Sequence, residues 1–199
     1  NECLVNKTEQ RRRILEATKL LEEASGSRPV GFRAPCLRLN GATLDILTEL
    51  GYIYDSSVIA TFIPGYYGQP FASSKPYHFS VKSLGQEDTH AFLEIPVSAN
   101  PILPIPLSAA WMRNLGSFWV RFGILMNFAM RRPVVFYIHP RDVLRLPKIR
   151  GIPWHVYRRV GPSSISMLEQ ILTNSMRIGA SFMRAVDLAR SYCASRLCK

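Results

Sequence analysis

Three polar residues of different chemistry each follow a short apolar stretch of the chain directly: Arg33, Asp55 and His139. Arginine supplies a permanent cation, aspartate a carboxylate, and histidine an imidazole that gives or takes a proton near neutral pH. Such stretches are typical of the strands of a parallel sheet, and the loops after strand carboxyl ends build the active sites of α/β barrels. We therefore expect these three side chains to converge on one catalytic rim.

The elements that must position these residues alternate between helices and short strands. We expect helices at residues 8–24, 41–50, 110–130 and 163–178 and strands at 29–32, 52–54, 92–97, 133–138 and 181–185, before a terminal helix. The expected helix caps are Thr8, Asn40, and Ser163 or Ser164. The order of the elements predicts a parallel sheet in an α/β fold.

Two further stretches have a distinct character. Residues 60–90 are rich in Gly, Pro, Ser and Tyr, and we expect a long functional loop there. In the helix at 163–178, the apolar side chains recur at helical spacing and form the expected buried stripe: Ile165, Leu168, Ile171, Leu172 and Met176.

Length and composition exclude several classes of protein. The 199 residues are 47% hydrophobic and 20% charged, which is ordinary for a globular chain and unlike a disordered tail, a collagen or a coiled coil. No run approaches about 18 apolar residues, so we expect no membrane-spanning helix. No signal peptide follows Asn1, and both a cytoplasmic and a cell-envelope location stay open. Four scattered cysteines without a C-x-x-C pair predict neither a disulfide scaffold nor a zinc knuckle.

The net charge of +11 lies in the second half of the chain. Residues 1–110 hold 10 Lys and Arg against 11 Asp and Glu, whereas residues 111–199 hold 15 against 3. A basic half is either a solvated face or a surface for an anionic membrane or an acidic glycan. Zinc-finger spacing, RNP-like segments and Gly-rich phosphate loops are absent from the sequence, so no nucleic-acid partner is expected.

Four ordered segments carry a resemblance to a known family: GFRAP at 31–35, LGYIYDSS at 50–57, EIPVS at 94–98 and VVFYIHPRD at 134–142. Together they resemble polysaccharide deacetylases of the NodB-homology type, carbohydrate esterase family 4, in the branch with YDSS and FYxHPxE/D segments. The resemblance implies a partial domain at residues 1–190 with a tail at 191–199. It also implies an α/β fold comprising the C-terminal two-thirds or more of a distorted (β/α)7 barrel.

The resemblance implies hydrolysis of N-acetyl groups on an amino-sugar polysaccharide or glycan. By matching motif positions, His139 corresponds to the general acid, Asp55 to the acidic residue that holds or tunes it, and Arg33 to the arginine that orients the catalytic base. A carboxylate neighbour should raise the pKa of His139, and Asp142 is an alternative partner for it. Pro35 would shape the groove.

Aromatic side chains are candidates for sugar stacking. Trp111 and Tyr66, together with Tyr67 and Trp154, could stack on sugar rings, although packing in the core or in loops is equally open.

The family's metal, usually zinc, is held by an Asp from a TFDDG-like segment and two His from an H-x-x-x-H-like segment, and neither motif occurs in this sequence. Asn1 stands near the place of the second His, so either Asn1 replaces it or the sequence begins within that segment. We therefore expect zinc or another divalent metal in the complete protein and no tight metal site in this chain. Two alternatives stay open: a deacylase or deformylase of a lipid-linked sugar, and a non-catalytic carbohydrate-binding homologue.

Overall fold

A computed structural model describes residues 6–61, 72–79, 92–145 and 147–197. Four short strands form one sheet in the order β1-β2-β4-β3. The strands are β1 (Gly31–Phe32), β2 (Tyr54–Asp55), β3 (Tyr77–Phe79) and β4 (Phe92–Glu94). The first, second and fourth run parallel, and β3 is antiparallel to β4. The α/β class is confirmed. The described strands make an open sheet, and the closed (β/α)7 barrel stays a prediction.

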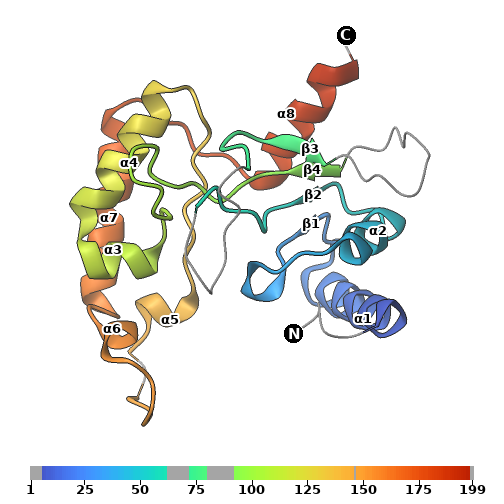
Figure 1. The fold of residues 1–199 in the computed structure, drawn as a ribbon, viewed down its shortest axis with the longest axis horizontal. Coiled ribbons are helices and arrows are strands. Elements are labelled where there is room, and N and C mark those ends of the chain that lie inside the picture. Colours follow the sequence, from blue (N-terminus) through green and yellow to red (C-terminus); the bar gives the residue numbers. More distant parts are fainter. Residues whose placement is uncertain (1–5, 62–71, 80–91, 146, 198–199) are drawn as a thin grey trace.

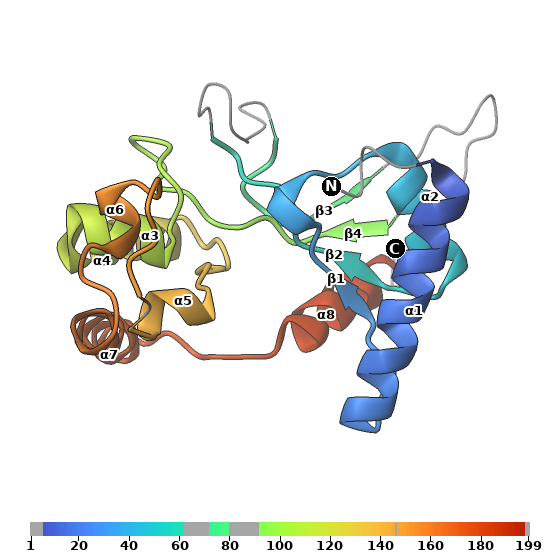
Figure 2. The ribbon, with the colours of Figure 1, turned by 90° about the horizontal axis from the view of Figure 1, so that it is seen from below.

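Two helices cover one face of this sheet (Figures 1 and 2). They are α1 (Lys7–Ser25) and α2 (Gly41–Glu49), and their apolar side chains pack with Tyr52 and Phe92. Asn40 caps α2 as expected, since its side chain accepts from the Thr43 N–H at 2.8 Å. The expected cap of α1 is wrong, because the side chain of Asn6, not that of Thr8, accepts the N–H of Glu9. The helix therefore begins at Lys7, one residue earlier than expected.

The opposite face is covered by α8 (Ala185–Leu197), whose Leu188, Ala189 and Tyr192 contact the sheet residues Leu93 and Tyr54. Successive residues of a strand point to opposite faces, which is why Phe92 meets α1 and α2 while Leu93 meets α8. Helix α8 continues past residue 190. The division into a domain at 1–190 and a tail at 191–199 stays a prediction.

A second group consists of helices and lies beside the sheet (Figure 1). It contains α3 (Ala109–Leu115), α4 (Ser117–Ala129) and α7 (Pro162–Arg177), packed on Leu107, Met112, Val120, Ile124 and Ile171. The expected single helix at 110–130 is divided at Gly116, whose φ of 102° is not helical. Glycine adopts such a φ readily, so the chain turns there and α3 packs against α4.

The expected beginning and buried stripe of α7 need correction. Gly161 is the N-cap and Pro162 the first helical residue, and Ser164 lies buried within the helix. Ile171 is buried, but Ile165, Leu172 and Met176 are exposed. Their positions have helical spacing, yet packing against α3 and α4 covers only one side of the helix.

Two expected strands are not formed within the described residues. Residues 133–138 make one isolated bridge, Ser108 to Tyr137, because their other backbone contacts go to separate residues such as Ser98. Residues 181–184 are exposed and form no strand. Two short helices, α5 (Pro140–Val143) and α6 (Trp154–Tyr157), and a 3-10 turn, η2 (Pro35–Leu37), complete the structure. None of the described helices combines the length and apolar character needed to cross a bilayer.

Candidate active site

Arg33 follows β1 and is held by the segment after β2. Its Nε donates to the Ser56 carbonyl at 2.7 Å, and its Nη2 donates to Ser56 Oγ at 2.6 Å. Ser56 in turn donates its hydroxyl to the carbonyl of Ile95 at 2.7 Å, beyond β4. Both hydrogen bonds of Arg33 within the described part of the chain thus go to one serine, which is fixed to the next strand. This network positions the guanidinium at the carboxyl end of the sheet.

Tyr137 connects Arg33 to His139. The Arg33 guanidinium carbon lies 5.0 Å from the centre of the Tyr137 ring. The Tyr137 hydroxyl lies 2.9 Å from Nε2 of His139, with the two ring centres 4.6 Å apart. The structure therefore places Tyr137 between Arg33 and His139, a tyrosine that the sequence reasoning did not single out. The alternation of Tyr137 and His139 along an extended chain was the available signal.

His139 is the N-cap of α5, and Asp142 holds it there. Asp142 Oδ2 accepts the backbone N–H of His139 at 2.9 Å, while Nδ1 of His139 is 3.9 Å from the same oxygen. Asp142 also binds Arg113, with Nε and Nη2 at 3.0 and 2.8 Å from Oδ1. Both side chains of this ion pair are nearly buried, at 3% and 2% exposed. The alternative carboxylate predicted from the sequence is thus in place, as an anchor of the His139 backbone.

The pKa of His139 is lowered from its ordinary 6.5, first by burial and then by the charge of Arg141. Asp142 acts in the opposite direction, and Arg33 adds to the lowering. Asp142 does raise the pKa of His139, as expected of a carboxylate, but the expected net increase is wrong because the pKa is lowered overall. The reason is that burial of the imidazole and the charges of Arg141 and Arg33 together outweigh the effect of Asp142. Neutral imidazole is the favoured form near pH 7.

Asp55 is fully buried, and its carboxylate accepts hydrogen bonds from the loop that follows it. Its two carboxylate oxygens accept the N–H and the hydroxyl of Ser57, each at 2.8 Å. Ser57 Oγ also accepts the N–H of Ala34 at 2.7 Å, which ties the residue after Arg33 to the same carboxylate. The expectation that Asp55 holds His139 is not met in the described contacts, because the charges acting on His139 are those of Arg141, Asp142 and Arg33.

Glu94 is a site residue that the sequence reasoning missed. It lies opposite Asp55 in the ladder, is 0% exposed, and accepts the Val58 N–H at 2.9 Å. Burial and the neighbouring Asp55 raise the pKa of Glu94 to about 9. Burial also raises the pKa of Asp55, while Glu94 and Ser57 oppose that shift. Two carboxyl groups this close hold one proton between them near neutral pH. The signal was a lone acid inside the apolar run at 92–97.

The described residues do not fit a divalent metal. Among them, no three His, Cys, Asp or Glu side chains come together as a ligand set. One pair, His139 and Asp142, is already committed, since Nε2 of His139 faces Tyr137 and the carboxylate binds Arg113. Asn1 lies outside the described residues.

The residues expected to bind substrate differ in their exposure and in how they are connected to the site. Pro35 is exposed at the start of η2, two residues after Arg33. Trp111 is half-buried in α3, and that helix is tied to the site because the Ala109 N–H donates to the Tyr137 carbonyl at 2.8 Å. Tyr66 and Tyr67 lie outside the described residues. Trp154 is 70% exposed, with Arg158 over its ring.

Comparisons with known proteins agree with this architecture. No protein-family model matches the chain. The structure resembles the crystal structure of a proposed polysaccharide deacetylase from Mycobacterium smegmatis, with a TM-score of 0.63 at 16% identity over 98% of this chain. It spans 60% of that solved chain, and the likeness establishes a shared fold. A stretch of 58 residues is 38% identical to the peptidoglycan deacetylase-like protein FGM2 of Gibberella zeae, which is 29% of this chain and 17% of that protein.

Proposed function

We propose that this chain carries the proton-donating side of a deacetylase site that hydrolyses N-acetyl groups on an amino-sugar glycan. The observation that carries the proposal is the convergence of Arg33, Tyr137 and His139 at the carboxyl end of the sheet. The fold shared with one polysaccharide deacetylase and the local identity to a peptidoglycan deacetylase-like protein support the substrate class.

Amide hydrolysis needs a proton donor at the leaving nitrogen. Water adds to the carbonyl carbon, the carbon–nitrogen bond breaks, and the electron pair of that bond goes to nitrogen, which leaves as an amine once it has gained a proton. In the proposal His139 gives that proton, and the water that is consumed restores it. A lowered pKa makes the imidazolium of His139 a stronger acid.

Arg33 has a different part in the proposal. Its guanidinium is permanently charged, and the described residues use only Nε and Nη2 as hydrogen-bond donors. Its remaining donors are suited to a carboxylate or to a polarised carbonyl oxygen of the substrate. Asp55 contributes by holding Ala34 and Ser57 in place, which fixes the loop that presents Arg33.

Whether the reaction depends on a metal is a separate part of this proposal. Because the described donors do not fit a divalent cation, we assign no step to one, and the ligands implied by the family resemblance would have to come from other residues.

The decisive experiment measures acetate release from an N-acetylated glycan by the complete protein and by His139→Ala. We expect kcat to fall by about 10²–10⁴, the usual contribution of a positioned acid. An activated aryl acetate needs no protonation of its leaving group, so its hydrolysis should change far less. Equal losses on the amide and on the aryl ester would contradict the assignment of His139 as the proton donor.

A deacylase of a lipid-linked sugar is a second candidate, favoured by the exposed basic segment that follows His139. Release of an acyl group from a lipid-linked amino sugar, but not from a soluble glycan, would distinguish it.

A further inference from the structure

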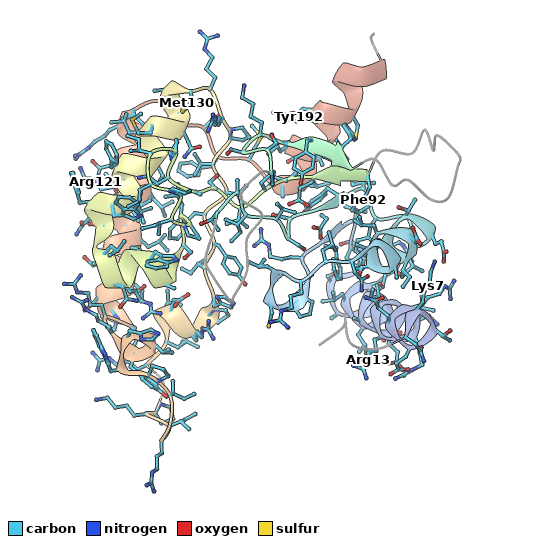
Figure 3. All side chains as sticks on the ribbon, viewed as in Figure 1. Lys7, Arg13, Phe92, Arg121, Met130 and Tyr192 are labelled. Carbon is cyan, nitrogen blue, oxygen red and sulfur yellow. The ribbon has the colours of Figure 1, made fainter. Side chains whose placement is uncertain are left out.

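The segment from the end of α5 to the first residues of α6 projects from the molecule and is exposed throughout its described residues. We call residues 144, 145 and 147–155 the basic loop. Every one of them is exposed, and in Figure 1 the segment extends beyond α5 and α6, away from the sheet. Figure 3 shows its side chains pointing outward from the ribbon. A loop of this kind is a candidate contact surface.

The basic loop combines positive charge with exposed apolar side chains. Its cations are Arg145, Lys148 and Arg150, and no Asp or Glu occurs between Asp142 and Glu169. Its apolar side chains are unusually open: Ile149 is 64% exposed, Ile152 45% and Trp154 70%. Among the ion pairs of the described residues, none involves these three cations.

The base of the basic loop is held by the buried ion pair below His139. Arg113, which binds Asp142, also donates from Nη1 to the carbonyls of Val156 and Arg158 at 3.1 and 2.6 Å. The Ile149 N–H donates to the Tyr157 hydroxyl at 2.9 Å, which closes the loop on α6. The exposed side chains therefore stand on a defined backbone, and the anchor that holds them also holds His139.

This mixture of side chains fits a lipid surface better than other polyanions. A soluble acidic glycan or a nucleic acid would be attracted by the cations but would gain nothing from exposed isoleucines. At a bilayer, apolar side chains enter the boundary between headgroups and acyl chains, tryptophan favours the interface, and Lys and Arg meet anionic headgroups.

We propose that the basic loop docks this protein onto an anionic membrane surface, with Ile149, Ile152 and Trp154 inserted among the lipids. The cations Arg145, Lys148 and Arg150 lie beside lipid phosphates. This inference stands independently of the proposed hydrolysis.

The test uses sedimentation of the chain with vesicles of phosphatidylcholine alone and of an equimolar mixture with phosphatidylserine. We expect binding to the anionic vesicles only, weakened by salt. Since each basic residue near an anionic surface contributes about a fivefold change in partitioning, Lys148→Ala with Arg150→Ala should weaken binding by roughly 10–30-fold. Arg177→Ala, on the exposed side of α7, is the matched control and should leave binding unchanged.

Insertion is tested separately from charge. Ile149→Ser with Ile152→Ser should weaken vesicle binding but leave retention on heparin unchanged, and Phe118→Ser on α4 is the apolar control. Trp154 emission should shift to shorter wavelength on anionic vesicles and be quenched by brominated lipid, and Trp154→Phe should remove both effects. The proposal is overturned if anionic vesicles fail to bind, if loop and control variants behave alike, or if heparin binds while vesicles do not. That last result would assign the loop to an acidic glycan.

Discussion

The hydroxyl of Tyr137 lies 2.9 Å from Nε2 of His139, so one ring nitrogen of the candidate proton donor is occupied by a protein group. The two residues are separated by one position on an extended backbone, which places their side chains on the same side. Burial raises the pKa of Tyr137, so the phenol keeps its proton. The hydroxyl either donates to Nε2 or accepts from an Nε2–H, and the tautomer of His139 sets which.

Tyr137→Phe tests this arrangement. The variant keeps the ring under Arg33 and removes only the hydrogen bond, so we expect the ¹⁵N resonances of His139 to shift because Nε2 loses its partner. A neutral hydrogen bond contributes about 0.5–1.5 kcal/mol, so deacetylation should slow by about 2–13-fold if the bond acts at the transition state. Tyr52→Phe is the control, since it removes a phenol hydrogen bond to Thr18 in the core. Unchanged His139 resonances in Tyr137→Phe would contradict the contact.

The pKa of His139 itself is a second prediction. An NMR titration should give a value below 6.5, because burial and Arg141 disfavour the imidazolium. Arg141→Gln should raise that pKa, whereas Arg177→Gln should not. The folded chain binds fewer protons at His139 than the unfolded chain does, so this residue's contribution to stability is present above pH 6.5 and is lost as the pH falls.

The same pKa places the alkaline limb of kcat/KM for the free protein below pH 6.5. A limb well above that value would argue against His139 as the acid.

Glu94→Gln should stabilise the protein at alkaline pH. In the folded state Glu94 keeps its proton up to about pH 9, whereas an ordinary glutamate releases it near 4.5. Stability therefore falls as the pH rises between these values, and glutamine, which is permanently neutral, removes that loss. We expect a higher Tm than the wild type at pH 8, by about 2–4 °C for each kcal/mol regained, and a vanishing difference near pH 4.5. Glu23→Gln on the exposed side of α1 is the control. A variant less stable than the wild type at pH 8 would refute the shared-proton description.

Arg113→Met should be strongly destabilising. It leaves Asp142 charged and buried without its partner, and breaking such a pair costs about 3–5 kcal/mol. Urea denaturation measures the loss, and Arg113→Met with Asp142→Leu should recover much of it because no unpaired charge remains. Arg184→Met, which breaks the exposed pair with Asp187, should change stability little. If the double variant were as unstable as the single one, the cost would lie in packing and not in the ion pair.

Several features of this protein follow from the sequence alone because their causes are local. The helix cap at Asn40, the end of α1 at Gly26 and the end of α2 before Gly51 depend on side-chain acceptors and on positive φ within a few residues. The position of Arg33 just after a strand likewise follows from the apolar stretch before it.

Other features were decided only by the tertiary structure, because they depend on which distant segments lie beside each other. Strand register sets Glu94 against Asp55, and although a lone acid in the apolar run at 92–97 marks Glu94 as unusual, the run does not identify Asp55 as its partner. The run at 133–138 has the composition of a buried strand, yet it obtains only an isolated bridge from its neighbours. The sign of the His139 pKa shift depends on how deeply the fold buries the imidazole and on the arginines, Arg141 and Arg33, that the fold places near it. Electrostatic effects at a site are sums over neighbours in space, and a sequence specifies those neighbours only through the fold.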